Sequence, residues 1–177
     1  MLNFKLFLES AEYKAKKGES EVVHHLTTSD FKTNEFKPLS HFGTKEAARN
    51  VVKSKAEIMG KEPENVKAKH HAVRIKLGKV AWIKDQGDDH SPQSLSRVLH
   101  KAGHITKQQR EKHASLGRKL THGRIADDLR KNGIHTLAYK NRVEDRGSTS
   151  YMITHSSQVR HLKSTEADKS AKVNWKK

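Results

Sequence analysis

The chain has 177 residues and no cysteine, and it carries 36 Lys and Arg against 20 Asp and Glu, a formal net charge of +16. The absence of cysteine excludes disulfides, thiolate metal sites and a cysteine nucleophile. The charge surplus predicts a positive field around the molecule, polyanionic partners and nonspecific affinity for DNA. No apolar run approaches the roughly 20 residues of a membrane-spanning helix, so we expect no membrane association. The length predicts one folded domain, which we expect to be monomeric.

The two ends of the chain differ in composition from the middle. Residues 1–17 place apolar side chains among lysines, which predicts a short amphipathic N-terminal helix. Residues 164–177 are charged and poor in apolar groups, and we expect a basic mobile tail there. The folded domain is therefore expected to span residues 18–163.

Alternating apolar residues and helix-capping signals predict the elements of this domain in chain order. Strands are expected at 21–27, 66–77, 80–83, 135–140 and 148–154. Helices are expected at 45–59, 91–103, 106–116 and 118–132. The strands at 66–77 and 80–83 are expected to pair as a hairpin around Gly78. Strands that alternate irregularly with helices favour an α+β domain with a mainly antiparallel sheet and flanking helices over a doubly wound fold.

Thirteen histidines raise the question of a metal site. The adjacent pairs His24–His25 and His70–His71 lie on predicted strands, where neighbouring side chains point to opposite faces and cannot chelate one ion together. The sequence contains no HExxH motif, nucleophile elbow, phosphate-binding loop or GxGxxG motif. We therefore expect no metal site.

Two stretches concentrate the residues that could perform chemistry: HHLTTSDFKTNEFKPLSHFGTKEAA at 24–48 and YKNRVEDRGSTSYMI at 139–153. Together with AWIKDQGDDHS at 81–91, they resemble the ADP-ribosyltransferases of phage virion and polyvalent proteins, over roughly residues 24–163. The resemblance implies an ADP-ribosyltransferase-like split antiparallel sheet that binds NAD, as substrate, in the cleft between its halves.

The resemblance also implies residue roles. Glu144 would be the catalytic acid, assisted by His25. The residues expected to bind NAD are His25, Thr27, Phe42, Gly43, Thr44 and Tyr151. Cleavage of the bond between nicotinamide and ribose releases a neutral leaving group from a cation, and positive charge builds on the ribose. One carboxylate that stabilises this charge is therefore sufficient.

Two positions depart from the family pattern. Leu26 stands where the first motif has glycine. Arg142 stands two residues before Glu144, where transferases that modify arginine place Glu or Gln. An arginine acceptor is therefore not expected, and the alternatives are an anionic acceptor or a degenerate catalytic apparatus.

The segment MLNFKLFLE, followed by Ser10, resembles the capsid-targeting peptides of tailed-phage internal head proteins. A prohead protease removes such peptides, so cleavage after Glu9 is expected. The resemblance implies packaging in the virion interior and delivery to the host cytoplasm with the phage DNA.

Three functions follow as hypotheses. The first is transfer of ADP-ribose from NAD to a host protein or nucleic acid. The second is a non-catalytic, basic internal head protein that binds DNA or inhibits a host defence protein. The third is a toxin-like nuclease that uses His25, His41 and Glu144 as acid and base. The transferase requires His25 and Glu144 to face one cleft, whereas the non-catalytic protein does not.

Overall fold

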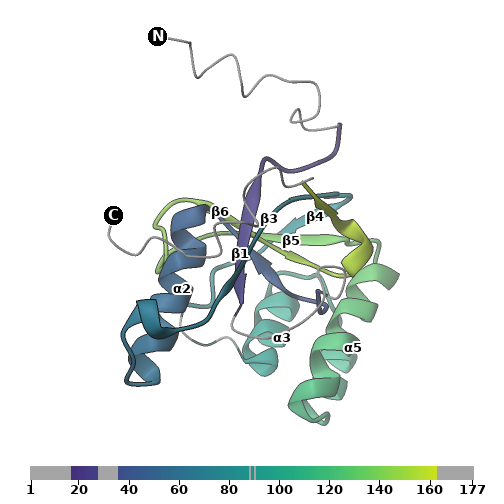
Figure 1. Ribbon diagram of the computed structural model, residues 1–177. Coiled ribbons are helices and arrows are strands. Elements are labelled where there is room, and N and C mark those ends of the chain that lie inside the picture. Colours follow the sequence, from purple (N-terminus) through teal and green to yellow (C-terminus); the bar gives the residue numbers. More distant parts are fainter. Residues whose placement is uncertain (1–16, 28–35, 88, 90, 163–177) are drawn as a thin grey trace.

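The computed structural model describes residues 17–27, 36–87, 89 and 91–162, which are coloured in Figure 1. The expected N-terminal helix, the cleavage site after Glu9 and the tail at 164–177 lie outside this part of the chain. Within the described residues, no helix is long and apolar enough to cross a membrane.

Seven strands of the described chain form two sheets. The first has the order β1–β3–β7 and is antiparallel; its strands are β1 (Val23–Thr27), β3 (Lys69–Ile75) and β7 (Val159–His161). The second has the order β2–β6–β5–β4; its strands are β2 (His41–Phe42), β4 (Val80–Trp82), β5 (Thr136–Lys140) and β6 (Thr149–Ile153). Only its β4–β5 pair is parallel. The predicted α+β class with a split, mainly antiparallel sheet is confirmed.

The expected hairpin of β3 and β4 is wrong. β3 pairs with β1 and β7, whereas β4 pairs with β5 in the other sheet. Gly78, at φ +56°, lies in the connection between the two sheets, and the Thr136 hydroxyl donates to the Leu77 carbonyl 2.6 Å away. Both edges of β3 are occupied by other strands, so a strand that follows it closely in sequence has to pair elsewhere.

The helices begin close to where the sequence predicts. They are α2 (Lys45–Ile58), α3 (Pro92–Lys101), α4 (Lys107–Ala114) and α5 (Arg118–Lys131), with 3₁₀ turns η1 (Pro63–Asn65) and η2 (Ser156–Gln158). The side chains of Thr44, Ser91 and Thr106 each accept a hydrogen bond from a backbone N–H of the first turn. These caps satisfy donors that have no partner inside the helix, which fixes the starting residues.

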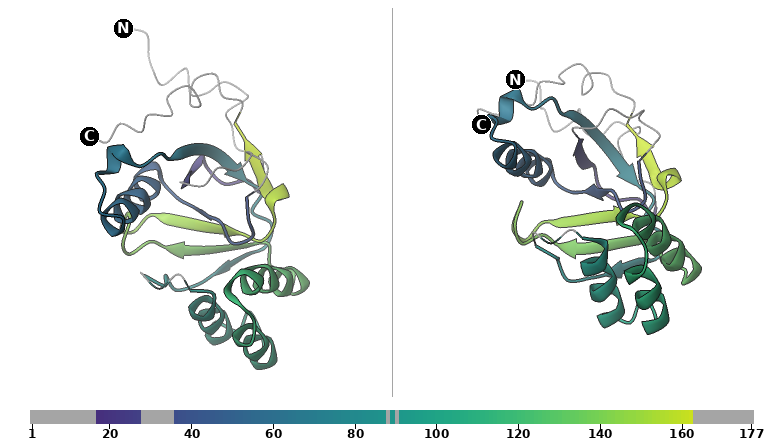
Figure 2. Two further views of the ribbon diagram at one scale, coloured as in Figure 1. Left: turned by 60° about the horizontal axis from the view of Figure 1, so that its bottom comes forward. Right: turned by 90° about the horizontal axis from the view of Figure 1, so that it is seen from below.

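The core has three parts that correspond to the layers. The largest lies between α3–α5 and one face of the four-stranded sheet, and includes Leu95, Leu99, Ile125, Leu129 and Leu137. A second joins the other face to the three-stranded sheet through Phe42, Val73, Ile75 and Ile153. A third packs α2 on β1. Figure 2 shows α3, α4 and α5 below the four-stranded sheet and the three-stranded sheet above it.

The two sheets are joined where β1 meets β2. The His24 N–H donates to the Gly43 carbonyl at 2.8 Å, and the Gly43 N–H donates to the His24 carbonyl at 3.0 Å. β1 belongs to the three-stranded sheet and β2 to the four-stranded sheet, so the two sheets diverge from this bridge.

Candidate functional site

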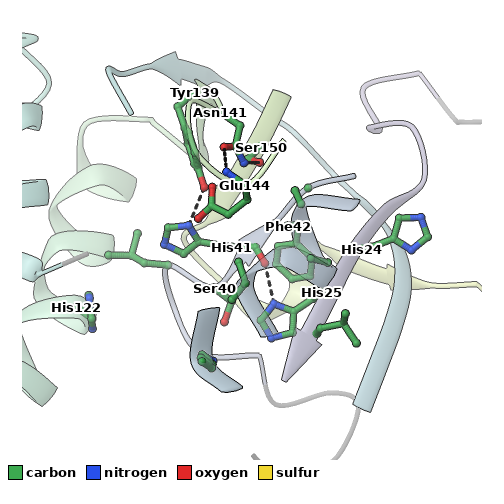
Figure 3. Close-up of a pocket in the computed structure, with 17 residues that line it drawn as sticks. His24, His25, Ser40, His41, Phe42, His122, Tyr139, Asn141, Glu144 and Ser150 are labelled. Atoms are coloured by element: carbon green, nitrogen blue, oxygen red, sulfur yellow. Dashed lines mark hydrogen bonds between the residues drawn. The ribbon is translucent and has the colours of Figure 1, made fainter. Parts of the chain in front are cut away.

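A pocket of about 350 Å³ lies at the junction of β1 and β2. Figure 3 shows its 17 lining residues, which come from β1, β2, α2, α5 and the region of β5, β6 and their connecting loop. The volume falls at the lower end of the roughly 300–1,000 Å³ that is typical of small-molecule sites. Segments far apart in sequence therefore meet around a space large enough for a small ligand.

The pocket brings together four of the residues expected from the sequence: His25, Phe42, Gly43 and Glu144. Thr27, Thr44 and Tyr151 do not line it. Each of these three residues has another place in the fold.

Thr44 contacts the loop that carries Glu144 without lining the pocket. Its hydroxyl accepts from the Ala47 N–H at 3.1 Å as the N-cap of α2, and donates to the Asp145 carboxylate at 2.5 Å. Asn50, one turn further along α2, donates from Nδ2 to the Glu144 carbonyl. Two bonds thus tie α2 to the loop that carries Glu144, and they determine where this loop lies.

Thr27 and Tyr151 lie on strands outside the pocket lining. Thr27 is buried at the end of β1, beyond the bridge to β2. Tyr151 packs against the cluster between the two sheets, while its neighbour Ser150 lines the pocket. Ser150 and Tyr151 are successive residues of β6 and point to opposite faces of the sheet.

His25 connects β1 to β2 through its side chain. Its Nδ1 lies 2.7 Å from the His41 carbonyl oxygen, which can only accept, so Nδ1–H is the donor. Burial lowers the pKa of His25 more than this bond raises it, and nearby Lys55 lowers it further. The imidazole is therefore neutral near pH 7, with Nε2 as an acceptor.

His41 and Tyr139 form a second polar pair in the pocket; His41 belongs to the segment 41–44 that the family resemblance places beside the nicotinamide, whereas Tyr139 was not predicted. His41 Nδ1 lies 2.9 Å from the Tyr139 hydroxyl. Burial and then the negative charge of Glu144 raise the pKa of Tyr139, so its hydroxyl stays protonated. In Figure 3 the Glu144 side chain lies beside this pair. The sequence signal that could have identified Tyr139 is the alternation in the segment HTLAYK at 135–140, which places Tyr139 on the same face of the strand as Leu137.

The loop that carries Glu144 has a defined hydrogen-bonding pattern. Asn141 Oδ1 accepts from the backbone N–H groups of Val143 at 3.1 Å and Glu144 at 2.9 Å. The Gly147 N–H closes the turn onto the Asn141 carbonyl at 2.8 Å, with Gly147 at φ +89°. Glu144 is partly buried. A loop with these bonds places the carboxylate at the pocket rather than in open solvent.

The two residues that depart from the family pattern differ in their relation to the pocket. Leu26 lines it and also packs in the cluster with Ala48 and Val52 of α2. Arg142 is exposed and does not line the pocket; its backbone N–H donates to Asp85 Oδ2 at 2.8 Å.

A third histidine of the pocket, His24, pairs across strands. Its Nδ1 lies 2.8 Å from His70 Nε2, and the two rings stack with centroids 5.0 Å apart. Within the described residues, no group of three or more His, Asp or Glu side chains is placed to hold a metal ion. Burial, His70 and Lys45 together lower the pKa of His24 to about 4.

No protein-family model, curated protein or solved structure matches this chain. Its function is therefore inferred from the pocket and the chemistry of the lining residues.

Proposed function

We propose that the protein transfers ADP-ribose from NAD to a host protein or nucleic acid, and that the pocket between β1 and β2 binds the nicotinamide ribose. One observation carries the proposal: His25 of β1 and Glu144 of the β5–β6 loop line the same pocket. The transferase hypothesis required this convergence, and a non-catalytic protein has no need of it.

The pocket's two kinds of lining fit the two parts of nicotinamide riboside. Apolar groups include Leu39, Phe42 and Val51, and an aromatic or aliphatic wall suits a flat nicotinamide ring. Polar groups include Tyr139, Asn141 and Ser150, which can bind ribose hydroxyls. At about 350 Å³ the pocket suits this half of NAD, and the adenylate half would lie outside it.

The charges in the pocket suit cleavage of the bond between nicotinamide and ribose. The bonding electron pair leaves with nicotinamide, which becomes neutral, and the ribose C1′ becomes electron-poor. The Glu144 carboxylate would stabilise that developing positive charge, and an acceptor nucleophile would then bond to C1′ and lose its proton. Neutral His25 would accept from a ribose hydroxyl, and the Tyr139 hydroxyl would donate to the ribose in the tautomer in which His41 Nδ1–H donates to Tyr139.

The same charges argue against the nuclease hypothesis. Lys55 is the one lysine or arginine among the described lining residues, and Glu144 would repel a phosphodiester. Burial also keeps His25 neutral, so it supplies no positive charge to bind a phosphate.

The test is incubation with NAD labelled in the ADP-ribose part and a host-cell extract. Wild-type protein should label a macromolecule, and Glu144→Gln should reduce the rate by a factor of about 100 or more. Glu57→Gln is the matched control, since Glu57 is exposed on α2 and does not line the pocket. It should transfer label like the wild type.

The effect of NAD on the melting temperature distinguishes loss of catalysis from loss of NAD binding. NAD should raise the melting temperature of both the wild type and Glu144→Gln, because both keep the pocket. Absence of label transfer together with absence of a thermal shift would reject the transferase. The non-catalytic, basic head protein would then be the better hypothesis.

The proposed location, the phage virion interior followed by the host cytoplasm, has its own test. Mass spectrometry of the protein taken from virions should find Ser10 at the N-terminus. An intact Met1 or Leu2 would contradict the cleavage and the packaging route that it implies.

A further inference from the structure

A row of side chains crosses the four-stranded sheet on the face opposite α3–α5. The register pairs Phe42 with Tyr151, Tyr151 with Ala138, and Ala138 with Trp82. Exposure differs along the row: Phe42 is buried under the three-stranded sheet, Tyr151 is partly exposed, Ala138 is buried and Trp82 is 55% exposed. The row therefore ends in an aromatic surface at β4, the edge strand of this sheet.

The two accessible rings are separated by a small residue. Neighbouring strands lie about 4.8 Å apart, so Trp82 and Tyr151, two strands apart, have backbones about 10 Å apart. Ala138 lies between them, and its methyl group is too small to project above the rings. Two rings thus stand on one face of the sheet, two strand spacings apart.

A lysine lies beside Trp82, and two further exposed cations lie on neighbouring segments. The Lys140 ammonium lies 5.9 Å from the centre of the Trp82 ring and donates to the Thr149 hydroxyl at 2.9 Å. The Asp85 carboxylate accepts from the Arg142 N–H, which holds the segment of exposed Lys84 against exposed Arg142. An exposed aromatic ring with cations beside it, on a chain of net charge +16, fits an anionic partner with flat rings.

We propose that this surface, defined by Trp82, Tyr151, Lys140, Lys84 and Arg142, binds single-stranded nucleic acid. A base stacks on Trp82, the next on Tyr151, and the cations contact the intervening phosphates. A duplex hides the faces of its bases, so the surface prefers single strands. Binding here is independent of the proposed transferase activity, because none of these five side chains lines the pocket.

The test uses fluorescence anisotropy with labelled oligo(dT) and a labelled duplex of the same length. Trp82→Ala should weaken single-strand binding about tenfold or more, since one stacked base is lost, and should change duplex binding less than about twofold. Trp82→Phe keeps a ring and should retain most of the affinity. The control Leu120→Ala removes an apolar group that is 68% exposed on α5, and should have no effect.

A pair of charge variants separates position from net charge. Lys140→Gln and Lys61→Gln each remove one exposed positive charge, but Lys61 follows α2 and is not part of the proposed surface. Lys140→Gln should weaken single-strand binding several-fold more than Lys61→Gln does. Equal losses would mean that only the overall charge attracts the nucleic acid, which would overturn the proposal.

Trp82 also gives a direct signal. The sequence has two tryptophans, so Trp175→Phe leaves Trp82 as the single reporter. Stacking of a base should quench its fluorescence on addition of oligo(dT), and addition of duplex should not. Unchanged fluorescence at saturation, or equal loss of single-strand and duplex affinity in Trp82→Ala, would overturn the proposal. Melting temperatures of all variants establish that they are folded.

Discussion

Gly43 shows how closely the backbone is packed beside the pocket. It makes both hydrogen bonds of the bridge to β1, and a Cβ placed on it would lie 2.8 Å from Ser150 Oγ and 3.2 Å from Ala47 Cβ. Its φ is not positive, so space rather than backbone conformation requires glycine here. Gly43→Ala should lower the free energy of unfolding by about 1–3 kcal/mol, measured by urea denaturation.

Two variants serve as controls for Gly43→Ala. A Cβ added to Gly123, inside α5, would meet no atom within 4 Å, and Gly123→Ala should stabilise the protein by about 0.5–1 kcal/mol. Adding Ser150→Ala to Gly43→Ala removes the closest clash and should recover part of the loss. Equal effects of the two glycine substitutions would contradict the close approach of Gly43 to Ser150.

His24 makes the stability depend on pH. Its pKa is about 4 in the folded protein against 6.5 when unfolded, because burial, His70 and Lys45 disfavour the charged ring. The unfolded chain therefore takes up a proton first as the pH falls from about 6.5 to 4, and stability decreases across that window. With allowance for partial exposure, the loss attributable to His24 is roughly 1–2 kcal/mol.

The variant His24→Gln should show a smaller loss of stability in this pH window than the wild type. Thermal denaturation at several pH values measures this dependence. Well above pH 6.5 neither the folded nor the unfolded state is protonated at this position, so the wild type and the variant should differ there by a constant amount. A profile of unchanged slope between pH 6.5 and 4 in the variant would assign the dependence to other groups.

At the residue scale, four residues of the predicted motifs, His25, Phe42, Gly43 and Glu144, line this pocket, whereas the tyrosine that lines it is Tyr139 and not Tyr151. Tyr139 and Tyr151 lie on adjacent strands and point to opposite faces of the sheet, so which of them lies at the pocket depends on pairing between distant strands. Alternation within one segment does not determine that pairing. Asn141 was also missed, because its role depends on the loop it closes.

Among the elements, α4 is held in an unusual way. His113 is its one buried side chain, and this histidine contacts both neighbouring helices. His113 Nδ1 lies 2.8 Å from Ser96 Oγ of α3, and Nε2 lies 3.0 Å from Asp128 Oδ2 of α5. All three side chains are buried, so this polar network takes the place that apolar packing has in most helices.

Substituting this histidine should therefore affect α4 selectively. His113→Ala leaves the Asp128 carboxylate buried with only Arg124 at 3.4 Å, and should cost about 2–4 kcal/mol of unfolding free energy. Hydrogen exchange should accelerate in α4 before it does in α5. Glu111→Ala, which breaks an exposed pair with Lys107 in the same helix, should cost less than about 0.5 kcal/mol. Similar costs for the two variants would contradict a structural role for the network.

Helix starts could be predicted and strand pairing could not, for a physical reason. A cap such as Thr44, Ser91 or Thr106 acts within one turn of its own helix, so the sequence around it contains the whole signal. β4 and β5 are separated in sequence by α3, α4 and α5, which pack on one face of the sheet. Their pairing therefore depends on contacts between apolar faces that are distant in sequence. The class of the fold follows from element order, whereas its pairing requires the assembled core.

At the scale of the whole molecule, the pocket and the aromatic surface meet on β5 through two neighbouring residues that point to opposite faces of the sheet. Tyr139 faces the pocket from β5, and its neighbour Lys140 lies beside Trp82 on the other face. A nucleic acid bound on the surface and a ligand in the pocket would thus contact adjacent residues of one strand without competing for the same side chains. If both proposals hold, each ligand can be titrated in the presence of the other.

The net charge of +16 should make stability depend on salt. Like charges repel in the folded protein more than in the expanded unfolded chain, so added NaCl should raise the melting temperature by a few degrees between low and physiological ionic strength. Close pairs act in the opposite sense, as between Arg160 and Glu19 at 2.7 Å, because salt weakens attraction too. The variants Lys61→Glu and Lys67→Glu, at exposed positions, reduce the net charge and should reduce the salt response. A melting temperature that falls on addition of NaCl would show that attractive pairs outweigh the surplus positive charge.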